Sequence, residues 1–120
     1  MTEPDTAVEA ARYRLLPDAL TPAAWAALAA MAMERFDLRF SLVRGVPRGG
    51  LPFARALERY AHPLWARTLI VDDVLTTGGS LARVRAQFPN DPLALVTFVR
   101  GPVPDDVMAL WTLAPARSEV

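Results

Sequence analysis

Two adjacent carboxylates followed by a turn rich in hydroxyls and glycines are the residues of this sequence best suited to chemistry. Asp72 and Asp73 follow the apolar run 68–71, and residues 76–80 read Thr-Thr-Gly-Gly-Ser. Carboxylates suit the paired hydroxyls of a sugar and the hard cation Mg²⁺. Glycines let backbone N–H groups close around a phosphate, while hydroxyls and a helix N-terminus add donors and a favourable dipole. The pattern therefore predicts a site for a phosphate group beside carboxylates that suit a sugar or Mg²⁺.

These residues belong to a chain in which strand-like and helix-like stretches alternate. Apolar or β-branched runs that predict strands occupy residues 40–43, 68–71, 93–99 and 107–113. Stretches that predict helices occupy residues 21–36, 51–60 and 80–88. The alternation predicts a three-layer α/β fold, in which helices flank a doubly wound, mostly parallel sheet of about four or five strands with right-handed crossovers.

The predicted sheet brings two glycine-rich loops to one edge. Ligands of such sheets bind in the crevice beyond the carboxyl ends of the strands, and loops 45–50 and 76–80 both leave strands there. If the strand continues through Asp72 and Asp73, these side chains point to opposite faces of the sheet. One carboxylate would then serve the ligand, and the other would face a neighbouring loop or a metal ion.

The length of the chain predicts one small domain. The 120 residues, 52% of them hydrophobic, are enough for a single modest core. We expect one domain over residues 1–120, with a ligand-binding core at about 40–113 and an N-terminal helical arm at 1–37.

Charge and residue usage exclude several classes of function. Basic and acidic residues both number 13, so no net charge draws the chain to nucleic acid or to an anionic membrane. All 13 basic residues are arginine and cysteine is absent, which excludes lysine Schiff bases, a P-loop lysine and cysteine-ligated metals. The longest uncharged stretch, 19–33, is too short to span a bilayer, and residues 1–9 do not look like a signal peptide. We therefore expect a cytoplasmic protein.

The segment from Val71 to Ser80 resembles the phosphoribosyl pyrophosphate (PRPP) signature of the type I phosphoribosyltransferases. The resemblance implies that Asp72 and Asp73 hold the ribose hydroxyls, and that both carry Mg²⁺ mainly through PRPP. It also assigns the 5′-phosphate to the turn, namely to Thr76, Thr77, Gly78, Gly79 and Ser80. An ordinary solvated turn and helix cap is the alternative interpretation.

Residues 45–50 resemble the pyrophosphate loop of the same family. The resemblance implies that backbone amides of this loop meet the leaving group, with Arg48 or Arg44 as the cation. A guanidinium suits this role because it pairs with two phosphate oxygens at once. The implied substrate-binding residues of the loop are Arg44, Pro47, Arg48, Gly49 and Gly50. The alternative is a plain turn with a solvated Arg48.

The segment 103–111 resembles, more weakly, the part of purine-using members that places a base beside an aromatic ring. The resemblance makes Trp111 a residue that could stack on a nucleobase. A core tryptophan on a strand is an equally good interpretation.

The activity implied by the resemblance is displacement of pyrophosphate from C1 of PRPP by a small nitrogenous acceptor such as a nucleobase. Asp72, Asp73 and Arg48 would be the catalytic residues, with Mg²⁺ as cofactor. Some 6-oxopurine enzymes of the family have an acid where Thr76 stands, and the short connection 61–67 leaves no room for the usual mobile loop. Two alternatives stay open, a non-catalytic module that binds PRPP or a nucleotide, and an interaction domain without ligand. A homodimer is also expected.

The remaining notable residues favour structural roles. His62 beside Pro63 predicts a loop residue, and Arg83 and Arg85 predict the polar face of a helix. The sequence also predicts that helix packing accounts for Trp25, Met31, Met33 and Phe36.

Overall fold

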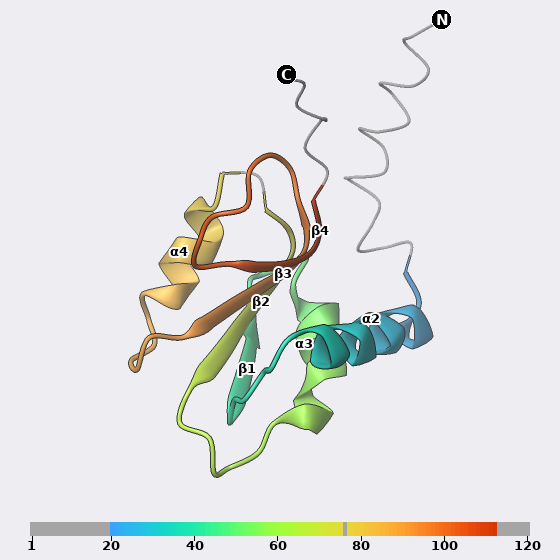
Figure 1. The fold of residues 1–120 in the computed structure, drawn as a ribbon, viewed down its shortest axis with the longest axis vertical. Helices are drawn as coiled ribbons and strands as arrows, with labels where there is room; N and C mark the ends of the chain where they lie inside the picture. Colours follow the sequence, from blue (N-terminus) through green and yellow to red (C-terminus); the bar gives the residue numbers. More distant parts are fainter. Residues whose placement is uncertain (1–19, 76, 113–120) are drawn as a thin grey trace, which may run out of the picture.

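The computed structural model describes residues 20–75 and 77–112 and confirms the α/β class (Figure 1). Four strands form one all-parallel sheet, and helices flank it. The elements are α2 (Pro22–Arg35), β1 (Leu42–Gly45), α3 (Leu51–Leu57), the 3-10 helix η1 (Glu58–Tyr60), β2 (Thr68–Leu75), α4 (Gly79–Arg85), β3 (Leu93–Val99) and β4 (Met108–Thr112). No helix in the described ranges is long and apolar enough to cross a membrane.

Side chains of alternating strand residues build two cores, one on each face of the sheet. On β2, Leu69 and Val71 belong to the core shared with α2 and α3, whereas Ile70 belongs to the core shared with α4. All three side chains are fully buried, as expected for a central strand covered on both faces. Figure 1 shows the same three layers, with α4 on one side of the sheet and α2 and α3 on the other.

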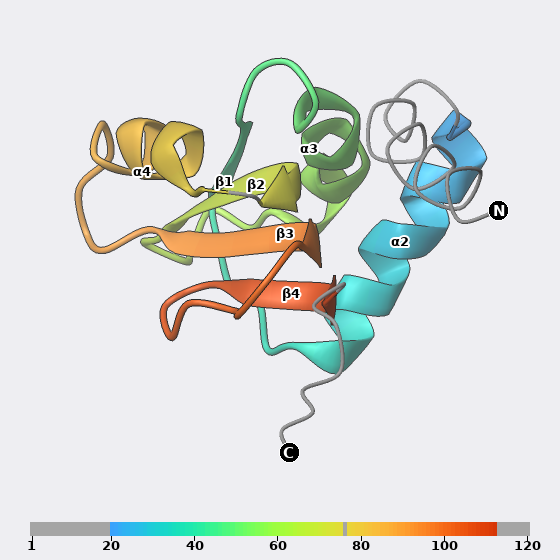
Figure 2. The ribbon, with the colours of Figure 1, turned by 90° about the horizontal axis from the view of Figure 1, so that it is seen from above.

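The order of the strands corrects the expected crossovers. The strands lie side by side as β1-β2-β3-β4, so both helical connections advance in the same direction across the sheet (Figure 2). Two right-handed crossovers in one direction would place both helices on one face. Because α3 and α4 lie on opposite faces, one of the two crossovers is left-handed. The consequence is that the helices that follow β1 and β2 cover opposite faces of the sheet.

Helix α2 begins where its local signals predict. The Thr21 hydroxyl accepts a hydrogen bond from the Ala24 N–H at 3.1 Å, and Pro22 occupies the first helical position. Trp25 is 2% exposed and its ring centroid lies 5.5 Å from that of Phe53 on α3. The predicted packing role of this helix is therefore confirmed, and it includes Met31, Met33 and Phe36. Residues 1–19 of the expected arm lie outside the described residues.

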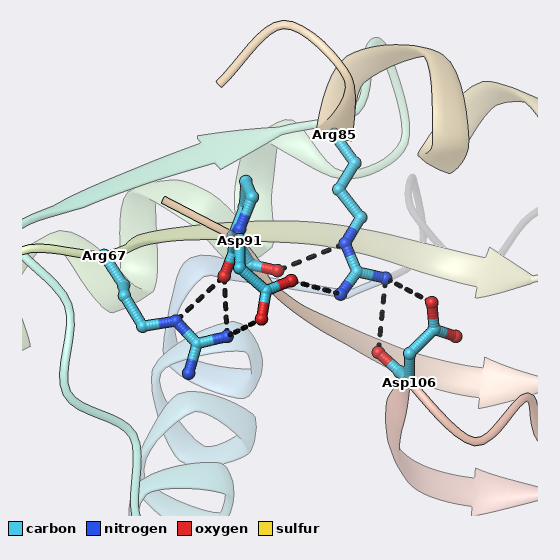
Figure 3. Close-up of polar contacts among 5 residues, drawn as sticks. Arg67, Arg85, Asp91 and Asp106 are labelled. Atoms are coloured by element: carbon cyan, nitrogen blue, oxygen red, sulfur yellow. Dashed lines mark hydrogen bonds and ion pairs between the residues drawn. The ribbon is translucent and has the colours of Figure 1, made fainter. Parts of the chain in front are cut away.

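An ion-paired cluster ties together the amino ends of three strands (Figure 3). Arg67 precedes β2 and donates to the Asp91 carboxylate at 3.2 Å and to the Asp91 carbonyl at 2.8 and 2.6 Å. Arg85 at the end of α4 donates to the Asp106 carboxylate at 2.9 Å and to the Pro92 carbonyl at 3.1 Å. Because these partners stand just before β3 and β4, the cluster holds the starts of the strands in register.

Candidate functional site

Asp72 and Asp73 lie within strand β2, which runs four residues past the predicted end at Val71. Pairing with β3 continues through Leu75 and Val99, and this partner keeps the chain extended. Asp72 is only 9% exposed, so it is buried and does not belong to a solvated turn, which was the alternative interpretation of this segment. The strand backbone also fixes both carboxylates, because Asp72 Oδ1 accepts the Asp73 N–H at 2.8 Å and Asp73 Oδ1 accepts the Val74 N–H at 2.7 Å.

The environment of Asp72 favours its protonated form. Burial, together with the neighbouring Asp73 carboxylate, raises the pKa of Asp72 to about 8. Within residues 20–75 and 77–112, neither aspartate forms an ion pair. Near neutral pH the pair therefore keeps a proton that a cation or a hydrogen-bonding ligand can displace.

The loop after β1 is anchored on the last residues of β2 before the aspartates. The Val46 N–H donates to the Val71 carbonyl at 2.8 Å, and the Gly50 N–H donates to the Val46 carbonyl at 2.9 Å. A Cβ on Gly50 would lie 2.5 Å from the same Val71 oxygen, so only glycine permits this approach. The peptide bond between Pro47 and Arg48 is cis. Loop 46–50 is thus held directly against the strand that carries the carboxylates.

Gly49 contacts Asp73 directly. A Cβ built on Gly49 would lie 2.5 Å from Oδ2 and 2.6 Å from Oδ1 of Asp73. The glycine-rich loop after β1 therefore meets the carboxyl end of β2. The alternation of side chains along the strand predicted that one carboxylate would face a neighbouring loop, and Asp73 does so. Which residue of the loop it meets depends on the packing of the two strands.

The turn after β2 leads into α4 and exposes the predicted phosphate-binding groups. Gly78 adopts φ 85° and precedes the helix, while Thr77, Gly79 and Ser80 are exposed. The Thr77 hydroxyl accepts the Gly79 N–H at 3.4 Å. Thr76 lies outside the described residues.

Arg83 is a residue of this turn region that the sequence reading assigned only to a polar helix face. Its guanidinium donates to the Ser80 hydroxyl at 3.3 Å, so it reaches back to the start of α4. The i, i+3 spacing of the two residues on a helix was a signal that could have indicated this contact.

The other predicted residues lie around the crevice without direct contact to the aspartates. Arg44, Pro47 and Arg48 are exposed, and neither arginine forms an ion pair in the part of the chain that the structure describes. Trp111 is 37% exposed and stacks on Phe98, with ring centroids 5.3 Å apart. Trp111 is therefore a surface residue of β4 and not a core tryptophan.

A cavity of about 530 Å³ lies beside α4 and reaches the start of the phosphate turn. Its lining residues are Leu75, Thr77, Gly78, Leu81, Ala82, Arg85, Ala86, Asp91, Pro104, Asp106 and Val107. Neither aspartate of β2 and no residue of loop 46–50 lines it. The predicted carboxylates and the loop after β1 therefore lie outside this cavity.

The carboxylates of Asp72 and Asp73 suit Mg²⁺ only when phosphate oxygens complete its coordination. In the described ranges, no group of three or more histidine, aspartate or glutamate side chains could hold a metal ion. Asp72 and Asp73 alone offer carboxylate oxygens, and Mg²⁺ is commonly bound by one or two carboxylates together with substrate phosphates. The pair therefore fits a Mg²⁺ ion that arrives with a phosphorylated substrate.

Comparison with known proteins reveals a shared fold. No protein-family model matches the sequence, and no curated protein matches it. Among solved structures, the chain is similar to the UMP synthase of Leishmania donovani, with a TM-score of 0.54 and 16% sequence identity. The likeness covers 74% of this chain but only 26% of that one, so this chain spans about a quarter of the enzyme's length. The likeness shows the fold alone.

Proposed function

We propose that this chain binds PRPP and transfers its ribose 5-phosphate group to a nitrogenous acceptor. The observation that carries the proposal is the contact between Gly49 of the glycine-rich loop and the carboxylate of Asp73. Through this contact, a loop suited to pyrophosphate adjoins carboxylates suited to ribose hydroxyls. In PRPP the pyrophosphate on C1 likewise stands next to the hydroxyl-bearing carbons.

The site would place each part of PRPP on a different segment. Asp72 and Asp73 would accept hydrogen bonds from the ribose hydroxyls. The exposed turn 77–80 would donate backbone and hydroxyl groups to the 5′-phosphate. Loop 46–50 would receive the pyrophosphate, and Arg48 or Arg44 would pair with its oxygens.

The chemistry of the proposed reaction needs positioning and charge stabilisation more than proton transfer. The nitrogen of the acceptor forms a bond to C1 while the bond from C1 to the pyrophosphate oxygen breaks, and pyrophosphate leaves with the electron pair. Arg48 and the amides of loop 46–50 would stabilise the negative charge that develops there. Mg²⁺ bound to pyrophosphate would neutralise part of the same charge.

Trp111 is the residue we propose for the acceptor. In the sheet, Val74 pairs with Phe98, and Phe98 pairs with Trp111. This row of residues lies two positions further along the strands than the pair of Asp72 and Val96. Trp111 therefore lies two strands away from Asp72, towards the carboxyl end of the same sheet. Two strand spacings across the sheet and two residues along it separate their Cα atoms by roughly 12 Å. That distance leaves room for a ribose between the carboxylate and a base stacked on the indole.

The fold likeness supports the same class of reaction. UMP, which the Leishmania enzyme makes according to its name, is a base joined to ribose 5-phosphate. Transfer from PRPP to a nitrogenous base yields products of that class.

The test is a ligand titration followed by an acceptor panel. With Mg²⁺ present, PRPP at about 100 times its Kd should stabilise the fold by about 2.7 kcal/mol, which differential scanning fluorimetry detects as a rise in Tm. A panel of nucleobases should then contain at least one compound that releases pyrophosphate faster than a reaction without acceptor. An absence of any Tm shift would contradict PRPP binding.

A PRPP-binding module without transfer is the second candidate. The connection 61–67 contacts the amino end of β1, because the His62 N–H donates to the Phe40 carbonyl and the Ser41 N–H to the Arg67 carbonyl, each at 2.9 Å. It lies at the edge opposite the aspartates and does not cover them. Enzymes that catalyse this kind of transfer are more effective when a loop closes over the substrate and excludes water. PRPP-dependent stabilisation without pyrophosphate release from any acceptor would favour the module.

A further inference from the structure

We propose that Gly49 is a positioning residue for the Asp73 carboxylate and thereby couples the pyrophosphate subsite to the ribose subsite. The inference rests on the proposed function and adds to it how the two subsites act together. The three atoms nearest to a Cβ at Gly49 all belong to the Asp73 carboxyl group, at 2.5, 2.6 and 2.7 Å. The backbone at Gly49 is not in the left-handed region, which among the described glycines only Gly78 and Gly101 adopt. Close approach, and not backbone conformation, is therefore what requires glycine here.

Neither side of this contact can easily move away. The Asp73 carboxylate is held by the Val74 N–H at 2.7 Å, and the side chain is too short to reorient without losing that bond. The loop is held by the hydrogen bond from Val46 to the Val71 carbonyl at 2.8 Å. A methyl group at position 49 must therefore displace the carboxylate or lift the loop from β2.

The coupling has a consequence for substrate recognition. A substitution at Gly49 that displaces the Asp73 carboxylate should weaken the binding of ribose 5-phosphate, although that ligand carries no pyrophosphate. A substitution that only removes a pyrophosphate contact should leave ribose 5-phosphate binding unchanged. The site would thus recognise the hydroxyls and the pyrophosphate of PRPP as one unit.

A double-mutant cycle on thermal stability tests the positioning without any ligand. Gly49→Ala should lower Tm by about 5 °C or more in the wild-type background and by less than half as much in the Asp73→Ala background. Gly101→Ala is the matched control, because Gly101 has φ 112° and no atom within 4 Å of an added Cβ. Its effect on Tm should be equal in both backgrounds. If Gly49→Ala fails to fold, Gly49→Ala combined with Asp73→Ala should fold.

Equal effects of Gly49→Ala in the two backgrounds, or a double variant that also fails to fold, would overturn the positioning role. The coupling is then tested by calorimetric titration with Mg²⁺ present. Gly49→Ala should weaken both ribose 5-phosphate and PRPP at least tenfold, whereas Arg48→Ala should weaken PRPP alone. Unchanged ribose 5-phosphate affinity in Gly49→Ala would overturn the coupling. Wild-type protein that binds neither ligand would refute the proposed function and the coupling, while the stability cycle would still decide whether Gly49 positions Asp73.

Discussion

The two ends of the sheet hold the same kinds of charged residue in opposite arrangements. At the amino ends of the strands, Asp91 and Asp106 accept hydrogen bonds from Arg67 and Arg85 (Figure 3). At the carboxyl ends, the nearest charged neighbour of Asp72 is another carboxylate, and no arginine in the described ranges pairs with either.

The charged residues at the amino ends pair with one another, whereas the carboxylates at the carboxyl ends have no cationic partner in the described ranges. The amino-end carboxylates are exposed, 84% for Asp91 and 68% for Asp106, so their ion pairs add little free energy but fix geometry. Asp72 is buried without a cation, which is unfavourable for the free protein and is relieved when a ligand supplies donors or a cation. The carboxyl end is therefore the end at which binding is expected.

The largest expected effect comes from neutralising the carboxyl-end pair. Asp72→Asn combined with Asp73→Asn should weaken PRPP binding about a thousandfold, because two charge-assisted hydrogen-bond acceptors are lost. Calorimetric titration with Mg²⁺ measures the loss. The matched control is Asp91→Asn at the amino end, which should leave the Kd for PRPP unchanged. Similar losses of PRPP affinity in both variants would contradict a binding role confined to the carboxyl end of the sheet.

The second effect concerns stability and pH. The folded-state pKa of Asp72 is about 8, above its ordinary value of 3.8, so between these values the folded protein binds more protons than the unfolded chain. The free energy of unfolding should therefore fall as the pH rises from 4 to 8. Asp72→Asn removes this dependence and should be more stable than wild type at pH 8, by a few kcal/mol, with no advantage at pH 4.

Urea unfolding at several pH values measures that difference. Asp91→Asn again serves as the control, because it makes the same exchange of carboxylate for amide at an exposed position of the amino end. An advantage of Asp72→Asn that is constant from pH 4 to 8 would contradict the buried, protonated state of Asp72.

The third effect tests the cation of the pyrophosphate loop. Arg48→Ala should weaken PRPP binding by about 1.5–3 kcal/mol and leave ribose 5-phosphate unaffected, since a charge-assisted contact to pyrophosphate is lost. Arg39→Ala is the control, because Arg39 is bonded to Asp37 away from the crevice. Titration of both ligands against both variants gives the comparison. Equal losses for the two ligands would assign Arg48 to another part of the substrate.

The smallest effect is expected at the amino end. Arg85→Ala removes the bonds to Asp106 and Pro92 and should lower stability by about 1 kcal/mol, or a few degrees in Tm. PRPP affinity should not change. Thermal unfolding and titration of the same preparation measure both quantities. Weakened PRPP binding would show that the two ends are not independent.

The parts of the fold that local signals determine were predictable from the sequence. Thr21 and Pro22 mark the start of α2, and the predicted strand 93–99 is β3, which follows Pro92 directly. The length of β2 was not predictable, because Asp72 and Asp73 stay extended through pairing with β3. The left-handed crossover likewise depends on which face each helix covers.

The candidate site was likewise predictable only in part. Residue types and the PRPP-like segment led to the carboxylates and to both glycine-rich loops. The burial of Asp72 and the contact between Gly49 and Asp73 arise from packing between neighbouring strands. The alternation along the strand predicted that one carboxylate faces a neighbouring loop, but not that Gly49 is the residue it meets.

The positions of the three tryptophans provide intrinsic optical reporters. Trp25 is enclosed in the core, Trp65 is 40% exposed in the connection at the amino ends, and Trp111 lies on β4 towards the crevice. Variants that keep a single indole would give fluorescence from one region each. Emission from Trp25 would follow unfolding, whereas quenching of Trp111 without change at Trp65 would locate an arriving acceptor at one end of the molecule.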